Sequence, residues 1–258
     1  MLICMAVYDT QENNRSWMTN ATLESLASTV DFSRHRLVVS DNGSCAETHE
    51  VYERWASTIP FEVIYNGKNI GTAAAINRGW RLREPGECAA KMDNDVVIHQ
   101  AQWADWMEDV FYRDPRIGIC GLKRKDLKEC PWSTNSWWQS KIRMLPHEPG
   151  HRWLVVEKVN HVMGTCQGYS AALLARMGYL YQPGLYGFDD SLSAVRAEVL
   201  GFESVFLCGF DIDHIDPGGT AFTEWKMQYA GTYMRTFNAL RDDYRRGRRD
   251  PYYDGGFA

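Results

Sequence analysis

Along its first 122 residues, the chain alternates short apolar runs with amphipathic stretches, and this alternation limits the possible folds more than any other feature. The apolar runs have the length of β-strands, and the stretches between them repeat apolar residues every three or four positions, as one face of a helix does. The predicted strands cover residues 2–7, 36–40, 61–65, 89–92 and 117–122. The predicted helices cover residues 17–30, 47–55, 72–82 and 102–112. Strands and helices that alternate in this way predict an α/β fold with a mostly parallel sheet flanked by helices.

The second half of the chain is less regular. Residues 123–152 contain three prolines and three of the ten tryptophans with little periodicity, and we expect them to form a long excursion from the sheet. Beyond it, strands are predicted at 154–156 and 203–207, and helices at 169–177, 191–200 and 222–240. The last helix places aromatic residues every three or four positions, so Trp225 is expected to face the core. We predict one domain over residues 1–221 and a C-terminal appendage, a helix and an arginine-rich tail, over 222–258.

The composition argues against several classes of protein. Apolar residues make up 45% of the chain and charged residues 24%, which is enough apolar content for a folded core. Twenty-eight basic against 33 acidic side chains give a net charge of −5, which argues against a protein coated with basic surface for nucleic acid. No apolar run approaches the ~20 residues of a membrane span, and the N-terminus is typical of a strand rather than a signal peptide. The seven cysteines are odd in number and contain no C-x-x-C pair, so we expect reduced thiols in a cytoplasmic protein without membrane contact.

Carboxylates follow three of the predicted strands, at the sheet edge where such folds bind their ligands. Asp93 and Asp95 come directly after the strand at 89–92, and on an extended chain residues two apart point the same way, so both can reach one cation. Oxygen ligands suit Mg²⁺ or Mn²⁺, which keep open positions for phosphates. An isolated D-x-D is more often a solvated turn, but its position after a central strand favours a metal site. Asp9 and Asp41 follow the first two strands; either alone is an ordinary turn residue, and together with the D-x-D they indicate a shared cleft.

Two further acidic clusters occur near the end of the predicted domain. Asp189 and Asp190 precede the helix predicted at 191–200, where one of them can cap the helix and the other can face the cleft as a general base. Spacing alone leaves these two roles open. His214 lies among the acids of residues 211–216, and it is either a metal ligand with carboxylates behind it or a hydrogen-bonded loop residue. The motifs of serine hydrolases, P-loop kinases and dinucleotide-binding proteins are missing from the sequence.

Taken in chain order, these motifs resemble those of a glycosyltransferase with the GT-A fold, of the family 2 type that uses nucleotide-diphospho-sugars. The matching residues are Val7-Tyr8-Asp9, Ser40-Asp41-Asn42-Gly43-Ser44, the spaced set Asn69, Gly71, Ala75, Asn77 and Gly79, Asp93-Asn94-Asp95, Tyr186-Gly187-Phe188-Asp189-Asp190, and His214. Each motif alone is modest, but their joint order over residues 2–220 is specific. The sequence departs from the family pattern where Asp189 replaces the usual glutamate and Tyr186 the usual tryptophan, changes that concern the acceptor and leave the metal site untouched.

The resemblance implies a GT-A-type, Rossmann-like domain with a nucleotide-binding half at 1–122 and an acceptor half at 123–221. It implies an enzyme that moves a sugar from a UDP-sugar to an acceptor hydroxyl, with inversion at the anomeric carbon. The residues that it assigns to the nucleotide sugar are Val7, Tyr8, Asp9, Asp41, Gly71, Ala75, Asp93 and Asn94. The residues that it assigns to Mn²⁺ or Mg²⁺ are Asp93, Asp95 and His214. It makes Asp190 the general base, with Asp189 as the alternative.

The acceptor and two other functions stay open. Trp132, Trp137 and Trp138 more often pack than bind, but with Tyr186 they are the candidate platform for an acceptor. A glycan or a small molecule is expected as acceptor, and a hydroxymethylated DNA base is a less favoured option. A sugar-nucleotide nucleotidyltransferase would want a basic, glycine-rich first loop, which residues 8–11 do not provide. A non-catalytic protein that binds nucleotide sugars or glycans would not need the paired carboxylates.

Overall fold

The computed structural model describes residues 1–126, 141–146 and 152–256. The strands are β1 (Leu2–Val7), β2 (Arg36–Asp41), β3 (Phe61–Tyr65), β4 (Ala89–Asp93), β5 (Val96–Ile98), β6 (Ile117–Arg124), β7 (Lys141–Met144), β8 (Val155–Val159), β9 (Cys166–Tyr169) and β10 (Glu203–His214). The helices are α1 (Ser16–Thr29), α2 (Ala46–Ala56), α3 (Thr72–Trp80), α4 (Trp103–Arg113), α5 (Ala171–Met177), α6 (Asp189–Val199) and α7 (Ala221–Arg245).

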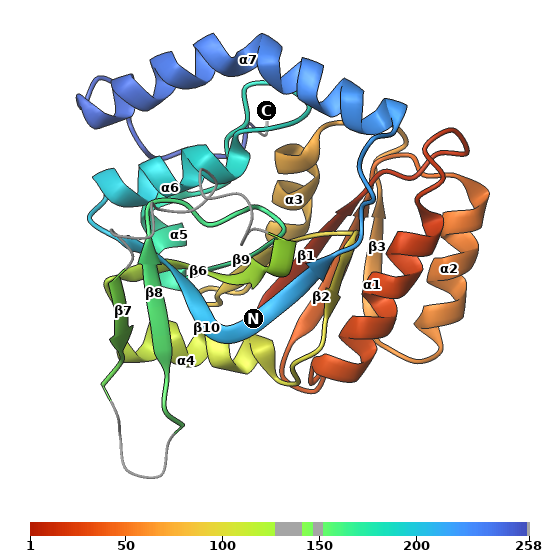
Figure 1. Ribbon diagram of the computed structural model, residues 1–258, viewed down its shortest axis with the longest axis horizontal. Helices are drawn as coiled ribbons and strands as arrows, with labels where there is room; N and C mark the ends of the chain where they lie inside the picture. Colours follow the sequence, from red (N-terminus) through yellow and green to blue (C-terminus); the bar gives the residue numbers. More distant parts are fainter. Residues whose placement is uncertain (127–140, 147–151, 257–258) are drawn as a thin grey trace.

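Within the described residues the strands form one sheet in the order β3-β2-β1-β4-β9-β6-β10-β8-β7, with β5 paired to β10 outside this path. Strands β5, β8 and β9 run against the other seven, so the sheet is mostly parallel, as predicted. The parallel strands β3, β2, β1 and β4 stand together in Figure 1, with helices on both faces of the sheet. The predicted α/β class is confirmed.

Strand β1 shows why the sheet needs a helical layer on each face. Its side chains alternate between two cores, with Ile3 and Met5 in one and Leu2 and Cys4 in the other. The first core is closed by α1, α2 and α4, and the second by α3, α5 and α6. A strand that is buried on both sides reads as a continuous apolar run, which is how residues 2–7 read in the sequence.

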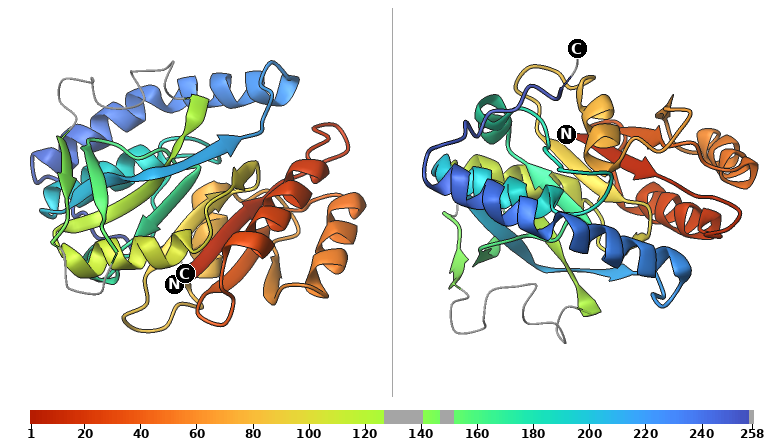
Figure 2. Two further views of the ribbon diagram at one scale, coloured as in Figure 1. Left: turned by 60° about the horizontal axis from the view of Figure 1, so that its bottom comes forward. Right: turned by 90° about the horizontal axis from the view of Figure 1, so that it is seen from above.

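Helix α7 forms an outer layer against α6. Leu192 and Val195 of α6 and Leu240 and Tyr244 of α7 make a third, smaller core. Figure 2, in the view from above, shows α7 crossing in front of α6 and reaching toward the end of β10. None of the helices in the described ranges is long and apolar enough to cross a membrane.

The chain after α7 returns to the domain. The backbone N–H of Tyr253 donates to the Met177 carbonyl, and that of Tyr179 donates to the Tyr253 carbonyl. Arg196, which is fully buried, donates to the carbonyl of Pro251 at 2.7 Å, and burial lowers the pKa of its guanidinium to about 10. The residues that follow α7 are therefore tied to α5 and α6, and the division at residue 221 remains a prediction.

In the first half the structure adds the short strand β5, which was not predicted, and the other differences from the predicted elements lie in the second half. The helix predicted at 169–177 begins only at Ala171, because Gln167 and Gly168 lie within β9 and do not form a turn. A Cβ on Gly168 would lie 2.9 Å from the Met107 sulfur, so the glycine serves close packing of β9 against α4. The excursion predicted at 123–152 contributes the end of β6 and β7. The three tryptophans at 132, 137 and 138 lie outside the described residues.

Candidate active site

A cavity of about 510 Å³ opens at the edge of the sheet where β1, β2 and β4 end. Tyr8 follows β1, Asn42 follows β2, and Asp93 ends β4; all three line the cavity. His214, at the end of β10, and residues in the first turns of α7 close the other side. This is the edge at which parallel α/β sheets bind their ligands, and the sequence predicted a site here.

The pairing of β5 with β10 brings Asp95 and His214 together. In this antiparallel register His214 lies opposite Val96, the residue that follows Asp95. The Ile215 N–H donates to the Asp95 carbonyl at 2.9 Å, which fixes the two backbones. As a result, His214 Nε2 lies 3.5 Å from Asp95 Oδ2.

Asp216 completes a group of three possible metal ligands with these two residues. Asp95, His214 and Asp216 each offer one ligand atom, and the three atoms lie within 4.8 Å of one another. Asp95 Oδ1 is buried and has no hydrogen-bond partner among the described residues, so this carboxylate has a lone pair available for a ligand. Two carboxylates and an imidazole suit Mn²⁺ or Mg²⁺, so the residues fit a divalent cation. The sequence placed Asp216 near His214 but gave it no role of its own.

Asp93, which the resemblance assigned to the metal, lies outside this group. The chain bends at Asn94 and Asp95 before β5 begins, so the two carboxylates of the D-x-D do not align as they would on an extended strand. The Asp93 side chain stays 35% exposed on the cavity wall, 3.9 Å from Lys91 Nζ. Although part of the side chain is open to the cavity, the protein around it removes much of its hydration and raises the pKa of Asp93 to about 6. The negative charges of Asp95 and Asp189 raise this pKa further, and the positive charge of Lys91 opposes them.

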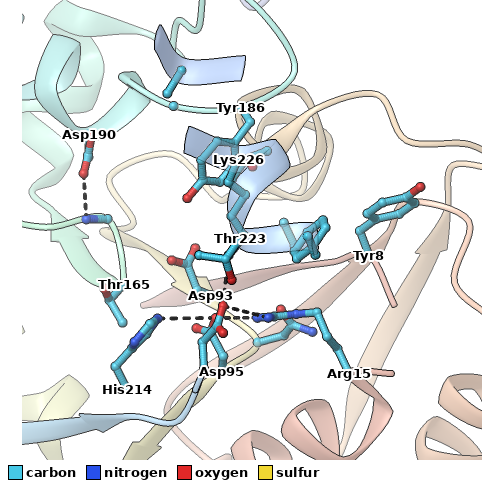
Figure 3. A pocket seen from close by; sticks show the side chains of 18 of the residues that line it. Tyr8, Arg15, Asp93, Asp95, Thr165, Tyr186, Asp190, His214, Thr223 and Lys226 are labelled. Carbon is cyan, nitrogen blue, oxygen red and sulfur yellow. Dashed lines mark hydrogen bonds and ion pairs between the residues drawn. The ribbon is translucent and has the colours of Figure 1, made fainter. Parts of the chain in front are cut away.

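Two basic side chains meet the carboxylates of the ligand group. Arg15 Nη2 lies 2.5 Å from Asp95 Oδ2, and Arg15 Nη1 lies 2.8 Å from Asp216 Oδ2. Lys226 Nζ of α7 lies 3.2 Å from the same oxygen of Asp216. Figure 3 shows His214 and Arg15 on opposite sides of Asp95.

These charges keep the ligand carboxylates ionised. Burial alone would raise the pKa of Asp216, but the Gly218 N–H, Arg15 and Lys226 lower it to about 2. Burial would also raise the pKa of Asp95, but His214 and Arg15 hold this pKa well below its usual range. No sequence motif marked Arg15, which precedes α1 and pairs with residues 80 and 201 positions away.

Asp189 and Asp190 are directed to different partners. Both lie in the first turn of α6, whose N-cap is Phe188, so neither takes the capping role that the spacing had left open. Asp189 Oδ2 accepts from Lys91 Nζ at 2.6 Å, and this pair is almost fully buried. Both aspartates and Lys91 nevertheless line the cavity.

Asp190 is held by a backbone N–H and a histidine. Its Oδ2 accepts from the Gly164 N–H at 3.0 Å and lies 3.2 Å from His161 Nε2. Burial alone would raise the pKa of Asp190, but His161, Lys91 and the Ser191 N–H hold it well below its usual range. In return, Asp190 raises the pKa of His161 against the opposing effect of burial. His161 had no signal in the sequence, where it belongs to no histidine pair or motif.

Four of the residues assigned to the nucleotide sugar line the cavity, namely Val7, Tyr8, Asp93 and Asn94. Asp9 and Asp41 lie behind the wall. Asp9 is fully buried and accepts from Thr19 Oγ1 at 2.5 Å and from Asn94 Nδ2 at 2.8 Å. The position of Asp9 beneath the wall follows from these bonds, which join the end of β1 to α1 and to the D-x-D segment.

Asp41 serves the turn that follows β2. Its Oδ1 accepts from the N–H groups of Gly43 and Ser44, and its Oδ2 accepts from the Tyr52 hydroxyl at 2.8 Å. The neighbouring Asn42 lines the cavity in its place. The contacts of Asp41 in the structure are therefore those of an ordinary turn residue, which is one of the interpretations that the sequence left open.

Gly71 and Ala75 also lie away from the cavity wall. Gly71 has φ +92°, and a Cβ there would come within 3.0 Å of the Leu185 Cα, so a glycine is required by the close approach of two backbone segments. Ala75 is fully buried in α3. From the same motif, Asn69 and Thr72 reach the cavity instead.

Aromatic residues form the side of the cavity that lies against α7. Tyr186 lines it, as the acceptor assignment required, with the Trp225 ring 6.3 Å away between centroids. Trp225 was expected in the core, but it is 36% exposed and lines the cavity with Phe222, because this end of α7 extends beyond α6. Lys226 Nζ lies 5.5 Å from the Tyr186 ring centre. This wall combines aromatic faces with one basic group.

Comparison with known proteins places the chain in a family. The family model described as Glycosyl transferase family 2 matches residues 12–178, more than half of the chain. No curated protein matches the sequence of this chain.

Several solved structures resemble the whole fold. The mannosyltransferase PcManGT from Pyrobaculum calidifontis, in complex with GDP-Man and Mn²⁺, has a TM-score of 0.67 at 16% identity, covering 93% of this chain and 64% of that one. A fragment of S. aureus TarS has a TM-score of 0.51 at 17% identity, covering 83% and 58%. GalNAc-T7 with UDP, GalNAc and Mn²⁺ has a TM-score of 0.58 at 12% identity, covering 83% and 43%. The chain thus spans less than two thirds of the length of these three proteins, and at such identities the likeness concerns the fold, which is GT-A. Since the family model matches most of the chain and the fold agrees with it, the chain belongs to glycosyl transferase family 2.

Proposed function

We propose that this chain transfers a sugar from a nucleotide sugar, with a UDP-sugar as the expected donor, to the hydroxyl group of an acceptor. The observation that carries the proposal is the meeting of two chemical groups in one cavity: the ligand group Asp95, His214 and Asp216, and the carboxylate of Asp190, which is paired with His161. In displacement at a sugar diphosphate, a divalent cation can neutralise charge on the departing diphosphate and a base can accept the proton of the attacking hydroxyl. GDP-Man, UDP and Mn²⁺ in the structures of PcManGT and GalNAc-T7 support a donor and a cation of this kind.

The donor side of the cavity carries positive charge and polar amides. Asp95, His214 and Asp216 would hold Mn²⁺ or Mg²⁺, which when bound neutralises negative charge on the departing diphosphate. Arg15, Lys226 and Arg124 line the same cavity and provide further positive charge for phosphate oxygens. We assign the nucleoside to the wall formed by Tyr8, Asn42 and Asn69.

On the other side, we assign the general base to Asp190. Its environment keeps it ionised, so it can accept the proton of an acceptor hydroxyl as the oxygen attacks the anomeric carbon. The bond from this oxygen to carbon forms as the bond from carbon to the diphosphate breaks, which inverts the anomeric centre. The charge of His161, 3.2 Å away, contributes to the depressed pKa and makes Asp190 a weak base, so the proton passes to it as the attacking oxygen bonds to carbon and becomes more acidic. Asp189 is the weaker candidate, since Lys91 already neutralises its charge.

For the acceptor, we propose a glycan or a hydroxyl-bearing small molecule that contacts Tyr186 and Trp225. Aromatic faces beside the base are suited to the C–H surfaces of sugars. A DNA base is less favoured, because Arg245 and Arg248 of the tail are paired with Glu198 and Asp243. Trp132, Trp137 and Trp138 remain candidates by the sequence argument. The free cysteines, six among the described residues, support a reducing, cytoplasmic compartment.

The test is a screen of UDP- and GDP-sugars with Mn²⁺ and a panel of acceptors, carried out on the wild type and on Asp190→Asn. We expect the variant to bind nucleotide and Mn²⁺ as the wild type does, while transfer falls by about 10²–10⁴-fold. Asp243→Asn, in a surface ion pair of the tail, is the control and should transfer normally. Undiminished transfer by Asp190→Asn would show that Asp190 is not the general base. A preference for a GDP-sugar would show that the donor is not a UDP-sugar.

A further inference from the structure

Arg15 is bonded to two of the three residues that would hold the cation. Its two terminal nitrogens reach different carboxylates, Nη2 that of Asp95 at 2.5 Å and Nη1 that of Asp216 at 2.8 Å. All three side chains are 5% exposed, so water does not screen these contacts as it would at the surface. The guanidinium therefore bridges the same carboxylates that a divalent cation requires.

The charges of this group balance without a metal. Asp95 and Asp216 carry one negative charge each, and Arg15 and Lys226 carry one positive charge each, all within 3.2 Å of their partners. A divalent cation that entered this group would add two positive charges beside a fixed guanidinium. A nucleoside diphosphate supplies the negative charge that would compensate them, so cation and nucleotide should bind more tightly together than separately.

The position of Arg15 also lets it serve the diphosphate. It lines the cavity, with its guanidinium carbon 5.2 Å from the ring centre of Phe222, another lining residue. A guanidinium binds phosphate oxygens in the same two-pronged manner as it binds carboxylates. Exchange of one partner for the other needs only a side-chain movement within the cavity.

We propose that Arg15 and the divalent cation are alternative partners of Asp95 and Asp216, and that binding of a nucleoside diphosphate transfers Arg15 from these carboxylates to the phosphates. This inference rests on the metal site of the proposed function. It makes Arg15 a positioning residue that keeps cation affinity low until the nucleotide is present. Of the two carboxylates, Lys226 forms an ion pair with Asp216 and Arg15 forms one with each, so Arg15 carries the larger part of this effect.

The test measures Mn²⁺ binding directly, by the electron paramagnetic resonance signal of free Mn²⁺, with and without UDP. For the wild type we expect weak binding alone and at least tenfold tighter binding with UDP. Arg15→Gln should bind Mn²⁺ alone 10- to 100-fold more tightly than the wild type, and UDP should add less than threefold. Arg36→Gln removes a positive charge from a pair with Glu87 that lies outside the cavity, so it should keep the wild-type pattern.

A second measurement covers the case in which Arg15→Gln folds poorly. In this variant two buried carboxylates lose a partner, so the Tm of Arg15→Gln in EDTA should be lower than that of the wild type. Saturating Mn²⁺ should raise the Tm of the variant by more than it raises that of the wild type. Arg15→Lys keeps the positive charge but cannot bond two carboxylates through two nitrogens. Its Mn²⁺ affinity and its Tm should therefore lie between those of the wild type and those of Arg15→Gln.

Equal or weaker Mn²⁺ binding by Arg15→Gln would overturn the exchange while leaving the metal site in place. Failure of every protein to bind Mn²⁺, with or without UDP, would overturn the metal site and the exchange together.

Discussion

At the scale of single residues, the chemistry of each carboxylate is decided by its partner. Asp189 and Asp190 are neighbours in the chain, but one faces a buried lysine and the other faces a histidine and a backbone N–H. The sequence could show that two acids stand before a helix. It could not show their partners, because Lys91 lies 98 residues away and His161 lies on a segment without a motif.

The pair of Lys91 and Asp189 predicts a large effect of a single substitution. Lys91→Met leaves Asp189 buried without its counter-charge, and we expect the free energy of unfolding to fall by about 3–5 kcal/mol. The double variant Lys91→Met with Asp189→Asn should recover much of this loss. Arg36→Gln, at the exposed pair with Glu87, is the control and should cost about 0–1 kcal/mol. Urea unfolding measures all three, and a loss below 1 kcal/mol in Lys91→Met would show that the buried pair is not intact.

The pair of His161 and Asp190 predicts how stability depends on pH. The pKa of His161 is raised in the folded state, so its contribution is fully present below the unfolded value of about 6.5 and is lost as pH rises through the higher folded value. The pKa of Asp190 is lowered, so its contribution is present above about 3.9 and is lost at lower pH. The difference in unfolding free energy between the wild type and His161→Gln should therefore be largest near pH 5–6 and smaller at pH 9. A difference that stays constant between pH 5 and pH 9 would contradict the pairing.

At the scale of elements, the site depends on one long strand. β10 runs for 12 residues, whereas the sequence predicted a strand only at 203–207. Its register against β6 shifts between Phe206 and Asp211, and its far end pairs with the three residues of β5. Local patterns predicted the first half well because its strands are short apolar runs between amphipathic helices. The extension of β10 depends on a partner more than a hundred residues away, which no local pattern contains.

A glycine in β10 tests whether this shift is structurally required. Gly209 lies at the shift with φ +84°, and a Cβ there would meet no atom within 4 Å. We expect Gly209→Ala to lower the free energy of unfolding by about 1–2 kcal/mol through backbone strain alone. Gly231 also has open space around it but lies inside α7, so Gly231→Ala should be neutral or stabilising by about 0.5–1 kcal/mol. Equal effects of the two substitutions in urea unfolding would argue against strain at the shift.

At the scale of the whole molecule, the cavity is assembled from both ends of the chain. Arg15 comes from the start, the D-x-D from the first half, and His214 and Lys226 from the last fifth. The motifs predicted which sheet edge carries the site and most of its acids. They could not predict that Asp216, and not Asp93, lies beside Asp95 and His214, because that placement depends on the bend after β4 and on the reach of β10.

The combination of a cation site with a nucleotide sugar in this cavity is tested most directly by one measurement. It is the rate of UDP release from a UDP-sugar in Mn²⁺ and in EDTA, for the wild type, Asp216→Asn and the control Asp243→Asn. We predict turnover that requires Mn²⁺ in the wild type and in the control, and that falls at least 100-fold in Asp216→Asn, with a higher Mn²⁺ concentration needed for half-maximal rate. Turnover that is the same in EDTA as in Mn²⁺, or that is undiminished in Asp216→Asn, would contradict a metal site formed by Asp95, His214 and Asp216.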